Sequence, residues 1–148
     1  MTSTAPTPIA DARVLGLAHY AARGLLEHVL SRHGITFTQQ IALRAAITAD
    51  APQTPDDLIN QIHTFLKTDS ADIHAVLDDL LARRLLTLDG AHLHPTETAR
   101  ELLTAIGADT APVTARVWGD IPAEDLAAAG RVLALVTERA KAELAALA

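Results

Sequence analysis

One short hairpin signal interrupts a sequence that otherwise has the apolar periodicity of helices. Residues 85–88 and 91–94 are short alternating runs, and the Asp89-Gly90 pair between them is a typical two-residue hairpin turn. Four amphipathic helical patterns precede the hairpin and two follow it. A helix pair that leads directly into a two-stranded hairpin is the layout of a winged helix-turn-helix. We therefore predict a mainly α-helical fold in which residues 85–94 form a short wing.

Capping residues and helix breakers indicate where each helix begins and ends. A side-chain oxygen at the N-cap or a proline at the first position marks a start, and Gly34 marks the end of the first helix, near Arg32. Gly107 and Pro112 are expected to kink or split the fifth helix. The expected starts, in chain order, are Asp11, Thr38, Thr54 with Pro55, Asp69 or Ser70, Pro95 with Thr96, and Pro122.

Composition excludes several classes of protein. The chain of 148 residues has no cysteine, which rules out disulfides, thiolate metal sites and cysteine nucleophiles. No apolar run approaches the roughly 20 residues of a membrane-spanning helix, so we expect no membrane partner. Residues 1–13 contain no basic patch followed by an apolar stretch, so we expect no signal peptide and a cytoplasmic location.

The sequence shows no arrangement typical of catalysis. It has no glycine-rich phosphate loop, and Ser31 and Ser70 have no evident base beside them. His92 and His94 share one side of a strand and are a possible metal pair, although two surface histidines are the favoured interpretation. We therefore expect a protein that is not an enzyme, with no obligatory cofactor and no metal site.

The net charge of −6 lies in one stretch of the chain. Residues 50–80 contain seven aspartates and one base, Lys67, while acids and bases balance in the remainder. Nucleic-acid binders normally concentrate positive charge on the surface that meets phosphate. This distribution argues against a generic nucleic-acid binder.

Four stretches resemble, in the same chain order, motifs of the MarR family of bacterial transcriptional regulators. Residues 34–46 are similar to the family's run from the end of its first helix into the second, and residues 76–86 to the end of its recognition helix. Residues 95–100 resemble the Leu-Thr-x-x-Gly-Arg motif after the wing, and residues 121–126 the start of the last helix. The resemblance extends over about residues 11–147.

The resemblance implies a homodimer built from a single domain at residues 11–148, which follows a flexible tail at residues 1–10. Helices within 11–33 and 95–148 would form the dimer stem, and residues 34–94 a winged lobe aimed at the DNA major groove. Family members often hold a small aromatic or phenolic ligand between lobe and stem, and this ligand weakens DNA binding. The implied function is that of a ligand-responsive transcriptional regulator.

The chain departs from the family where it should meet DNA. The family's recognition helix usually offers Ser, Thr and Arg, whereas the outward positions expected here include two carboxylates, Asp72 and Asp79. A carboxylate repels phosphate and accepts a hydrogen bond only from cytosine among the bases. The wing is about half the usual length and lacks the family's Asp-x-Arg motif, and Arg84 and Ala99 replace its glycines. The residues expected to face DNA are Asp72, His74, Ala75, Asp79, Arg83, Arg84 and Arg44.

The other aspartates of the acidic stretch have ordinary structural interpretations. Asp56, Asp57 and Asp69 suit helix starts, where the dipole favours a negative charge. Asp78 is commonly acidic in the family and is expected to pair with a nearby arginine.

The resemblance places an effector beside the first helix. His19 and Arg23 lie one turn apart, next to Tyr20, and an arginine with a histidine suits a carboxylate or phenolate. Alternatively, Glu27 forms an ion pair with Arg23 in place of a ligand, because it lies four residues further along the helix. Trp118 either lines the cavity that holds this effector or packs inside the dimer stem.

Two functions remain open. The first is a homodimer that binds double-stranded DNA and is released by a small aromatic or phenolic effector. The second is a dimer of the same fold that has lost DNA binding. It would act instead by binding a small molecule, by binding a protein, or by catalysis in the pocket.

Overall fold

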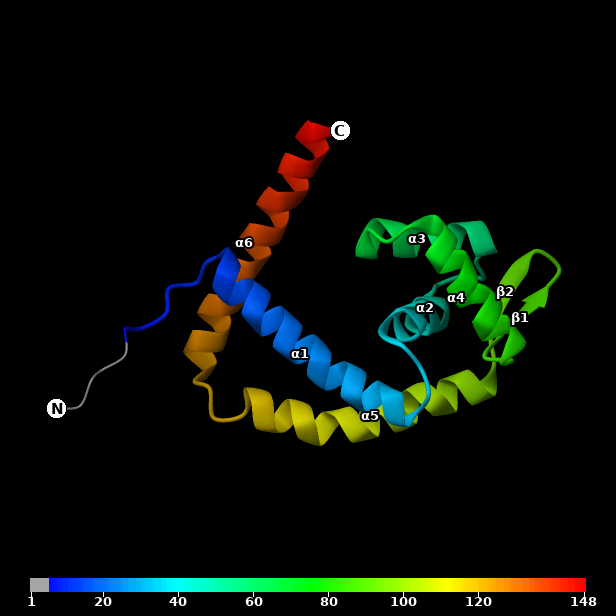
Figure 1. Ribbon diagram of the computed structural model, residues 1–148, viewed down its shortest axis with the longest axis horizontal. Coiled ribbons are helices and arrows are strands. Elements are labelled where there is room, and N and C mark those ends of the chain that lie inside the picture. Colours follow the sequence, from blue (N-terminus) through cyan, green and yellow to red (C-terminus); the bar gives the residue numbers. More distant parts are fainter. Residues whose placement is uncertain (1–5) are drawn as a thin grey trace. The chain divides into compact units, whose positions relative to one another are not determined.

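The computed structural model describes residues 6–148, which belong to two compact units with a boundary between Thr110 and Ala111. Six helices and one two-stranded hairpin make up the described part of the chain (Figure 1). Their bounds are α1 (Ala12–Arg32), α2 (Phe37–Thr48), α3 (Pro55–Leu66), α4 (Ser70–Ala82), β1 (Leu86–Asp89), β2 (His92–Pro95), α5 (Glu97–Trp118) and α6 (Ala123–Leu147). The mainly α-helical fold with a hairpin is therefore confirmed.

The segment before α1 has no regular secondary structure over residues 6–11, and its residues are exposed. The predicted tail covers residues 1–10, of which the first five lie outside the described residues. Asp11 ends this segment and caps α1, accepting a hydrogen bond of 2.8 Å from the backbone N–H of Val14.

Side-chain caps start the next three helices. The hydroxyl of Thr54 and the carboxylate of Asp57 form a reciprocal capping box at α3, and Asp69 accepts a hydrogen bond from Ala71 at α4. The expectation that Thr38 caps α2 is wrong. Thr36 caps it instead, and Gln39 completes a second capping box, which moves the helix start two residues earlier.

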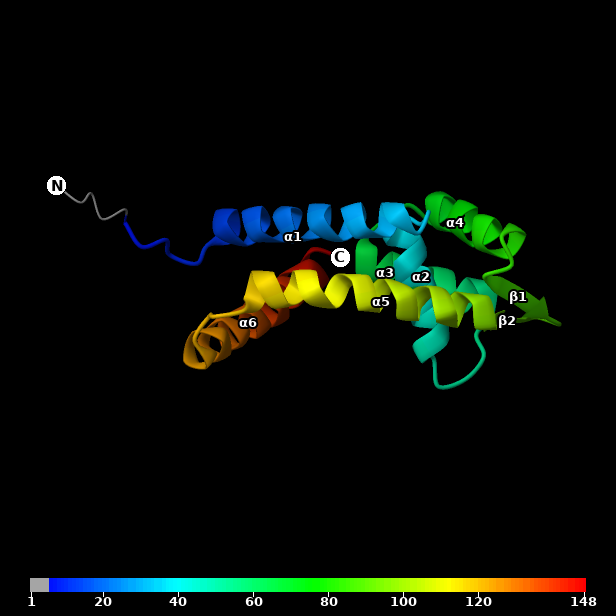
Figure 2. The same cartoon turned by 90° about the horizontal axis from the view of Figure 1, so that it is seen from below.

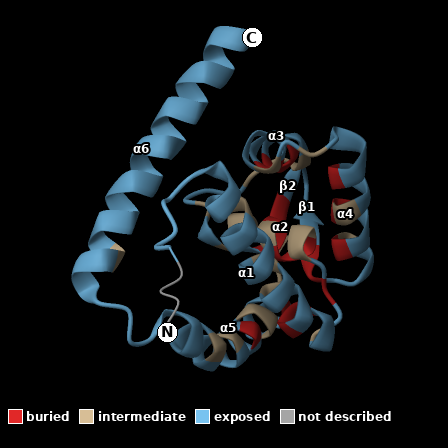
Figure 3. Ribbon diagram, turned by 60° about the vertical axis from the view of Figure 1, so that its left-hand side comes forward, coloured by how far each residue is buried: buried red, intermediate tan, exposed pale blue. Residues whose placement is uncertain are grey.

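The main core of the first unit lies between α2, α3, α4 and the hairpin (Figure 3). One apolar stripe from each helix faces it, because residues three and four positions apart share a helix face. The fully buried side chains include Leu43 of α2, Leu58 of α3, Leu80 of α4 and Leu86 of β1. This packing fixes which face of α4 is left for a partner.

A second, smaller cluster joins α1 to α5 within the first unit. Leu30 near the end of α1, Ile35 and Ile106 of α5 are buried together. Gly34 turns the chain between α1 and α2 with a φ of +68°, and the N–H groups of Gly34 and Ile35 bond back to Ser31 and Leu30. This is a Schellman ending, in which an αL residue satisfies the last carbonyls of a helix.

The wing is a two-residue hairpin, one position later than expected. The antiparallel register pairs Leu86 with Pro95 and Asp89 with His92, so Gly90 and Ala91 form the loop. The prediction of Asp89-Gly90 as the turn is thus wrong by one residue. The wing is also tied to the rest of the lobe, because the Leu93 N–H donates to the carbonyl of Gln53 at 2.8 Å.

Helix α5 runs without interruption from Glu97 to Trp118, past both Gly107 and Pro112 (Figure 2). Of the two expected outcomes, the split is wrong, and a kink at these residues stays a prediction. A proline removes one backbone N–H from the helical ladder, and the remaining bonds of a 22-residue helix keep the segment helical. The boundary between the two units falls inside this helix.

The second unit contains the end of α5 and all of α6. No residue of α6 is buried, and Figure 3 shows the helix almost entirely in the colour of exposed residues. None of the helices in the described part of the chain is long and apolar enough to cross a membrane.

Candidate nucleic-acid interface

Helix α4 presents one polar face to solvent and one apolar face to the core. Ile73, Leu77 and Leu80 are buried at helical spacing, whereas Asp72 and His74 are exposed. Ala75 is exposed on the same helix. The sequence prediction therefore identifies the surface of α4 that is left free by packing in the first unit.

Asp79 is exposed on the same helix, but its carboxylate is engaged within the lobe. Its Oδ2 accepts a hydrogen bond of 2.6 Å from the side-chain Nε2 of Gln39, which is 9% exposed. Arg83 lies 3.7 Å from the same oxygen. The ion pair that the sequence suggested for Asp78 thus belongs to Asp79, and the expectation that Asp79 faces DNA stays a prediction.

Arg83 is exposed, but it also has partners within the first unit. Its guanidinium donates a hydrogen bond of 3.0 Å to the backbone carbonyl of Gly34, between α1 and α2. Because the same side chain lies beside Asp79, Arg83 is held on both sides. Its assignment as a residue that faces DNA stays a prediction that would require it to leave these partners.

Arg84 occupies the position that ends α4. It has a φ of +56°, and the N–H groups of Arg84 and Leu85 bond back to Leu81 and Leu80. This Schellman geometry favours glycine, because an L-residue in the αL region is strained. Arg84, which stands where the family has glycine, therefore occupies a position that requires a left-handed backbone conformation.

The remaining candidates do not all meet at one place. Arg44 is exposed on α2, whereas the other six residues predicted to face DNA lie on α4 or directly after its end. Among the carboxylates of α4, neither Asp72 nor Asp78 has a side-chain partner within residues 6–148. In this part of the chain, Asp72 and Asp78 are therefore the carboxylates of α4 that have no ion-pair partner, whereas Asp79 has Arg83.

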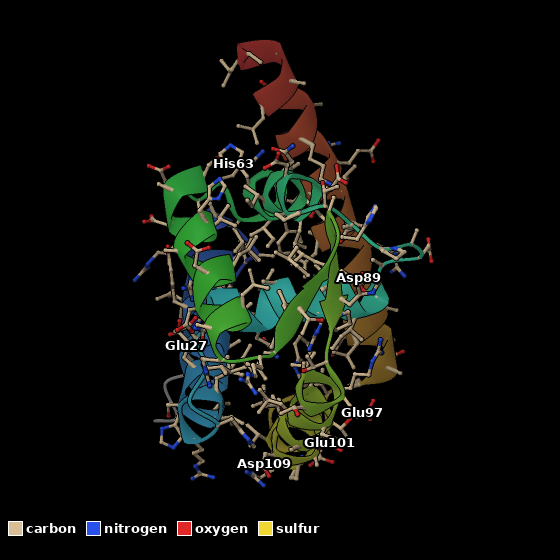
Figure 4. All side chains as sticks on the ribbon, turned by 90° about the vertical axis from the view of Figure 1, so that its right-hand side faces the viewer. Glu27, His63, Asp89, Glu97, Glu101 and Asp109 are labelled. Atoms are coloured by element: carbon tan, nitrogen blue, oxygen red, sulfur yellow. The ribbon has the colours of Figure 1, made fainter. Side chains whose placement is uncertain are left out.

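The predicted effector residues of α1 form two separate contacts. The rings of His19 and Tyr20 meet edge to face, with centroids 5.3 Å apart. The guanidinium of Arg23 bonds to the carboxylate of Glu27 at 3.1 Å and lies 4.5 Å from the centroid of the Phe37 ring. The alternative in which Glu27 forms an ion pair with Arg23 is confirmed. Figure 4 labels Glu27 on this helix.

The fourth predicted effector residue, Trp118, lies in the second unit, at the end of α5, and is 55% exposed. Its role in an effector site stays a prediction.

The hairpin register brings an acid beside one of the wing histidines. Asp89, which Figure 4 labels, lies on the hairpin. It is directly opposite His92 in the register, and Thr87 is opposite His94, all on one face of the ladder. The sequence interpretation missed this acid because it assigned Asp89 to the turn. Within the described residues, no group of three or more His, Cys, Asp or Glu side chains is arranged to hold a metal ion.

Sequence reasoning missed three residues that organise the lobe. Gln39 had a detectable signal, because Thr36 and Gln39 have the spacing of a capping box. His33 and Asp109 had none. The Nε2 of His33 lies 2.8 Å from the carboxylate of Asp109, which is 76 positions away, and no local pattern predicts such a pair.

The chain was compared with known proteins. No family model matches it, and no curated protein matches it. Solved structures do match over most of the chain. Apo wild-type MarR from Escherichia coli has 19% identity and a TM-score of 0.68, and the match covers 88% of this chain and 98% of that one. The chain has the winged helix-turn-helix fold of the MarR family.

Two further structures with the MarR fold were captured with ligands. Staphylococcus aureus MarR in complex with salicylate and kanamycin has 18% identity and a TM-score of 0.74, covering 88% of this chain and 90% of that one. A Mycobacterium tuberculosis MarR family protein in complex with DNA has 17% identity and a TM-score of 0.69, covering 87% and 98%. Identities this low establish the MarR fold of this chain without assigning its ligands.

Proposed function

We propose that the chain is a transcriptional regulator of the MarR type, which binds double-stranded DNA as a homodimer in the cytoplasm. The observation that carries this proposal is the exposed polar face of α4. The opposite, apolar face of the helix packs on the core, and the hairpin follows α4 in the chain. A helix presented in this way fits the major groove. The M. tuberculosis protein with this fold was captured with DNA.

The homodimer is supported by apolar side chains that the single chain leaves exposed. Helix α6 has no buried residue, although Leu133, Val136 and Leu144 lie along one side of it at helical spacing. Leu17 and Tyr20 of α1 are also largely exposed. Exposed apolar helix faces of this kind are typical of association with a second copy of the chain.

The effector in this proposal is a small aromatic acid or phenol, and His19, Tyr20 and Arg23 are its proposed ligands on α1. The salicylate complex of S. aureus MarR supports this ligand class. Arg23 already has a carboxylate partner in Glu27, so an acidic ligand would replace or share that contact. Trp118 is retained as a predicted fourth ligand.

The test of DNA binding is a titration of the purified protein against its own upstream DNA and against random DNA over a range of salt concentrations. Tight, selective binding that weakens steeply with salt would support the proposal. Absence of binding even at low salt would contradict it.

Adding salicylate to the complex of protein and DNA tests the effector. His19→Ala and Arg23→Ala should abolish release, whereas His28→Ala, on the exposed surface of the same helix, should leave it unchanged.

A second function is favoured by one observation, the negative charge of the lobe. Among residues 6–148, Asp72 and Asp78 have no ion-pair partner, and they lie in the stretch that carries the whole net charge of −6. In this alternative the chain keeps the MarR fold and its homodimer, lacks DNA binding, and acts through a small molecule or a basic protein surface, or by catalysis in the pocket. The same DNA titration separates the two functions.

A further inference from the structure

The segment between α1 and the first turn of α2, residues 33–39, takes part in the three side-chain hydrogen bonds of longest sequence separation in the described part of the first unit. Three side-chain hydrogen bonds in the described chain join residues that are 40, 49 and 76 positions apart. Each of them ends on this segment, which we call the α1–α2 junction. The partners on the junction are Gln39, Gly34 and His33, respectively.

Two of these bonds come from the end of the recognition helix. Asp79 accepts from the Gln39 amide at 2.6 Å, and Arg83 donates to the Gly34 carbonyl at 3.0 Å. Asp79 and Arg83 are one turn apart on α4 and 3.7 Å from each other. The C-terminal turn of α4 is therefore attached to the junction at two points by two adjacent, oppositely charged side chains.

Gln39 is suited to be a rigid anchor because both ends of its amide are used. Its Oε1 accepts the Thr36 N–H at 2.8 Å inside the capping box, and its Nε2 donates to Asp79. This pairing fixes the orientation of the amide, since only the nitrogen end can donate to a carboxylate. The residue is also nearly buried, so any loss of these partners would leave a desolvated polar group.

The third bond attaches the opposite side of the junction to α5. His33 Nε2 and Asp109 Oδ2 are 2.8 Å apart, and the His33 side chain is 18% exposed. Figure 4 labels Asp109 on α5. The apolar contacts of Leu30 and Ile35 with Ile106 lie beside this pair, so polar and apolar contacts hold the junction to the same helix.

We propose that Arg83 and Asp79 are positioning residues rather than DNA contacts, and that the junction links the recognition helix to α5. This inference rests on the proposed function and assigns its regulation. A conformational change in α1 or α5 is passed to the α1–α2 junction through the contact between Asp109 and His33. It then reaches α4 through the contacts that Arg83 and Asp79 make with the junction. A coupling of this kind requires a demonstrated energetic connection, which the following variants test.

The first test exchanges donor and acceptor between α2 and α4. Gln39→Glu keeps the capping-box acceptor but places a carboxylate against Asp79, so amide exchange of residues 80–85 should rise at least tenfold. Asp79→Asn still offers an oxygen to Gln39 and should change exchange less than twofold. The double variant Gln39→Glu with Asp79→Asn reverses the hydrogen bond and should restore protection. Failure of the double variant to restore it would overturn the role of this pair.

The second test measures transmission from α5, on the full chain without DNA. Asp109→Ala should raise amide exchange of residues 80–85 several-fold. Glu101→Ala, which removes an exposed acid from the same helix, should not change it. Equal exchange in the two variants would overturn the proposed link. Because both exchange experiments omit DNA, they give an answer even if the protein proves not to bind DNA.

The third test uses DNA and separates positioning from phosphate contact. Arg83→Ala should weaken binding at least tenfold while leaving the slope of affinity against salt concentration unchanged. A decrease of about one in that slope would show that Arg83 contacts a phosphate, and the positioning role would be rejected. If the unaltered protein does not bind DNA, the proposed function fails, and the exchange experiments alone decide the positioning role.

Discussion

The hydroxyl of Thr96 donates a hydrogen bond of 2.9 Å to the backbone carbonyl of Arg84, across the two ends of the wing. The same hydroxyl accepts from the Ala99 N–H at 3.2 Å, which makes it the cap of α5. Thr96 also uses its backbone N–H, which donates to the carbonyl of Leu85. One residue therefore closes the wing at its base and starts the helix that follows.

Thr96→Val should destabilise the protein by about 1–2 kcal/mol, because valine keeps the shape but removes the cap and the donor to Arg84. The free energy of unfolding from urea denaturation measures this. Thr98→Val is the matched control, since Thr98 is exposed on the first turn of the same helix, and its effect should stay within about 0.5 kcal/mol. Similar values for the two variants would contradict the role of Thr96.

Arg84→Gly should stabilise the protein by about 0.5–1 kcal/mol. The gain is the relief of roughly 1–2 kcal/mol of αL strain, reduced by the greater freedom of glycine in the unfolded chain. Arg84→Ala is the control, because it removes the charged side chain but keeps the strained backbone. If alanine stabilised the protein as much as glycine in thermal unfolding, the effect would come from the charge and not from the backbone.

The caps show how much of the fold was predictable. The sequence predicts the caps Asp11 and Thr54, and Asp69 as one of two candidates beside Ser70, because a cap and its helix lie within four residues of each other. The prediction of Thr38 as the cap of α2 is wrong by two positions, and Thr36 and Thr38 are both threonines near the same helix start. The two threonines would accept hydrogen bonds from backbone N–H groups two positions apart. Only the capping box with Gln39 identifies Thr36 as the cap.

The candidate interface was predictable only in its local part. The outward positions of α4 follow from helical periodicity, which places Asp72 and His74 outside the stripe that contains the buried Ile73 and Leu77. The engagement of Asp79 depends on Gln39, 40 positions away. Its distance in sequence leaves no periodic signal, because the contact exists only after α2 and α4 have packed together.

Asp72→Asn should tighten DNA binding several-fold at low salt, with the difference shrinking as salt increases, because the variant removes an unpaired negative charge from the face of α4. Fluorescence anisotropy over a salt series measures this. Asp50→Asn removes the same charge from an exposed position before α3 and should have a smaller effect. Equal effects would show that net charge matters and that its place on α4 does not.

Leu133→Glu should convert the protein from dimer to monomer in sedimentation velocity. Leu133 is 43% exposed on α6, on the same side as Val136 and Leu144. In a two-fold dimer each new carboxylate is buried against the equivalent surface of the second copy, where it has no partner. Ala142→Glu is the matched control, because the 3.6-residue period places Ala142 on the opposite side of the same helix. It adds the same charge and should leave the dimer intact. Identical sedimentation of both variants would show that this side of α6 does not form the interface, and the proposed homodimer would then need a different surface.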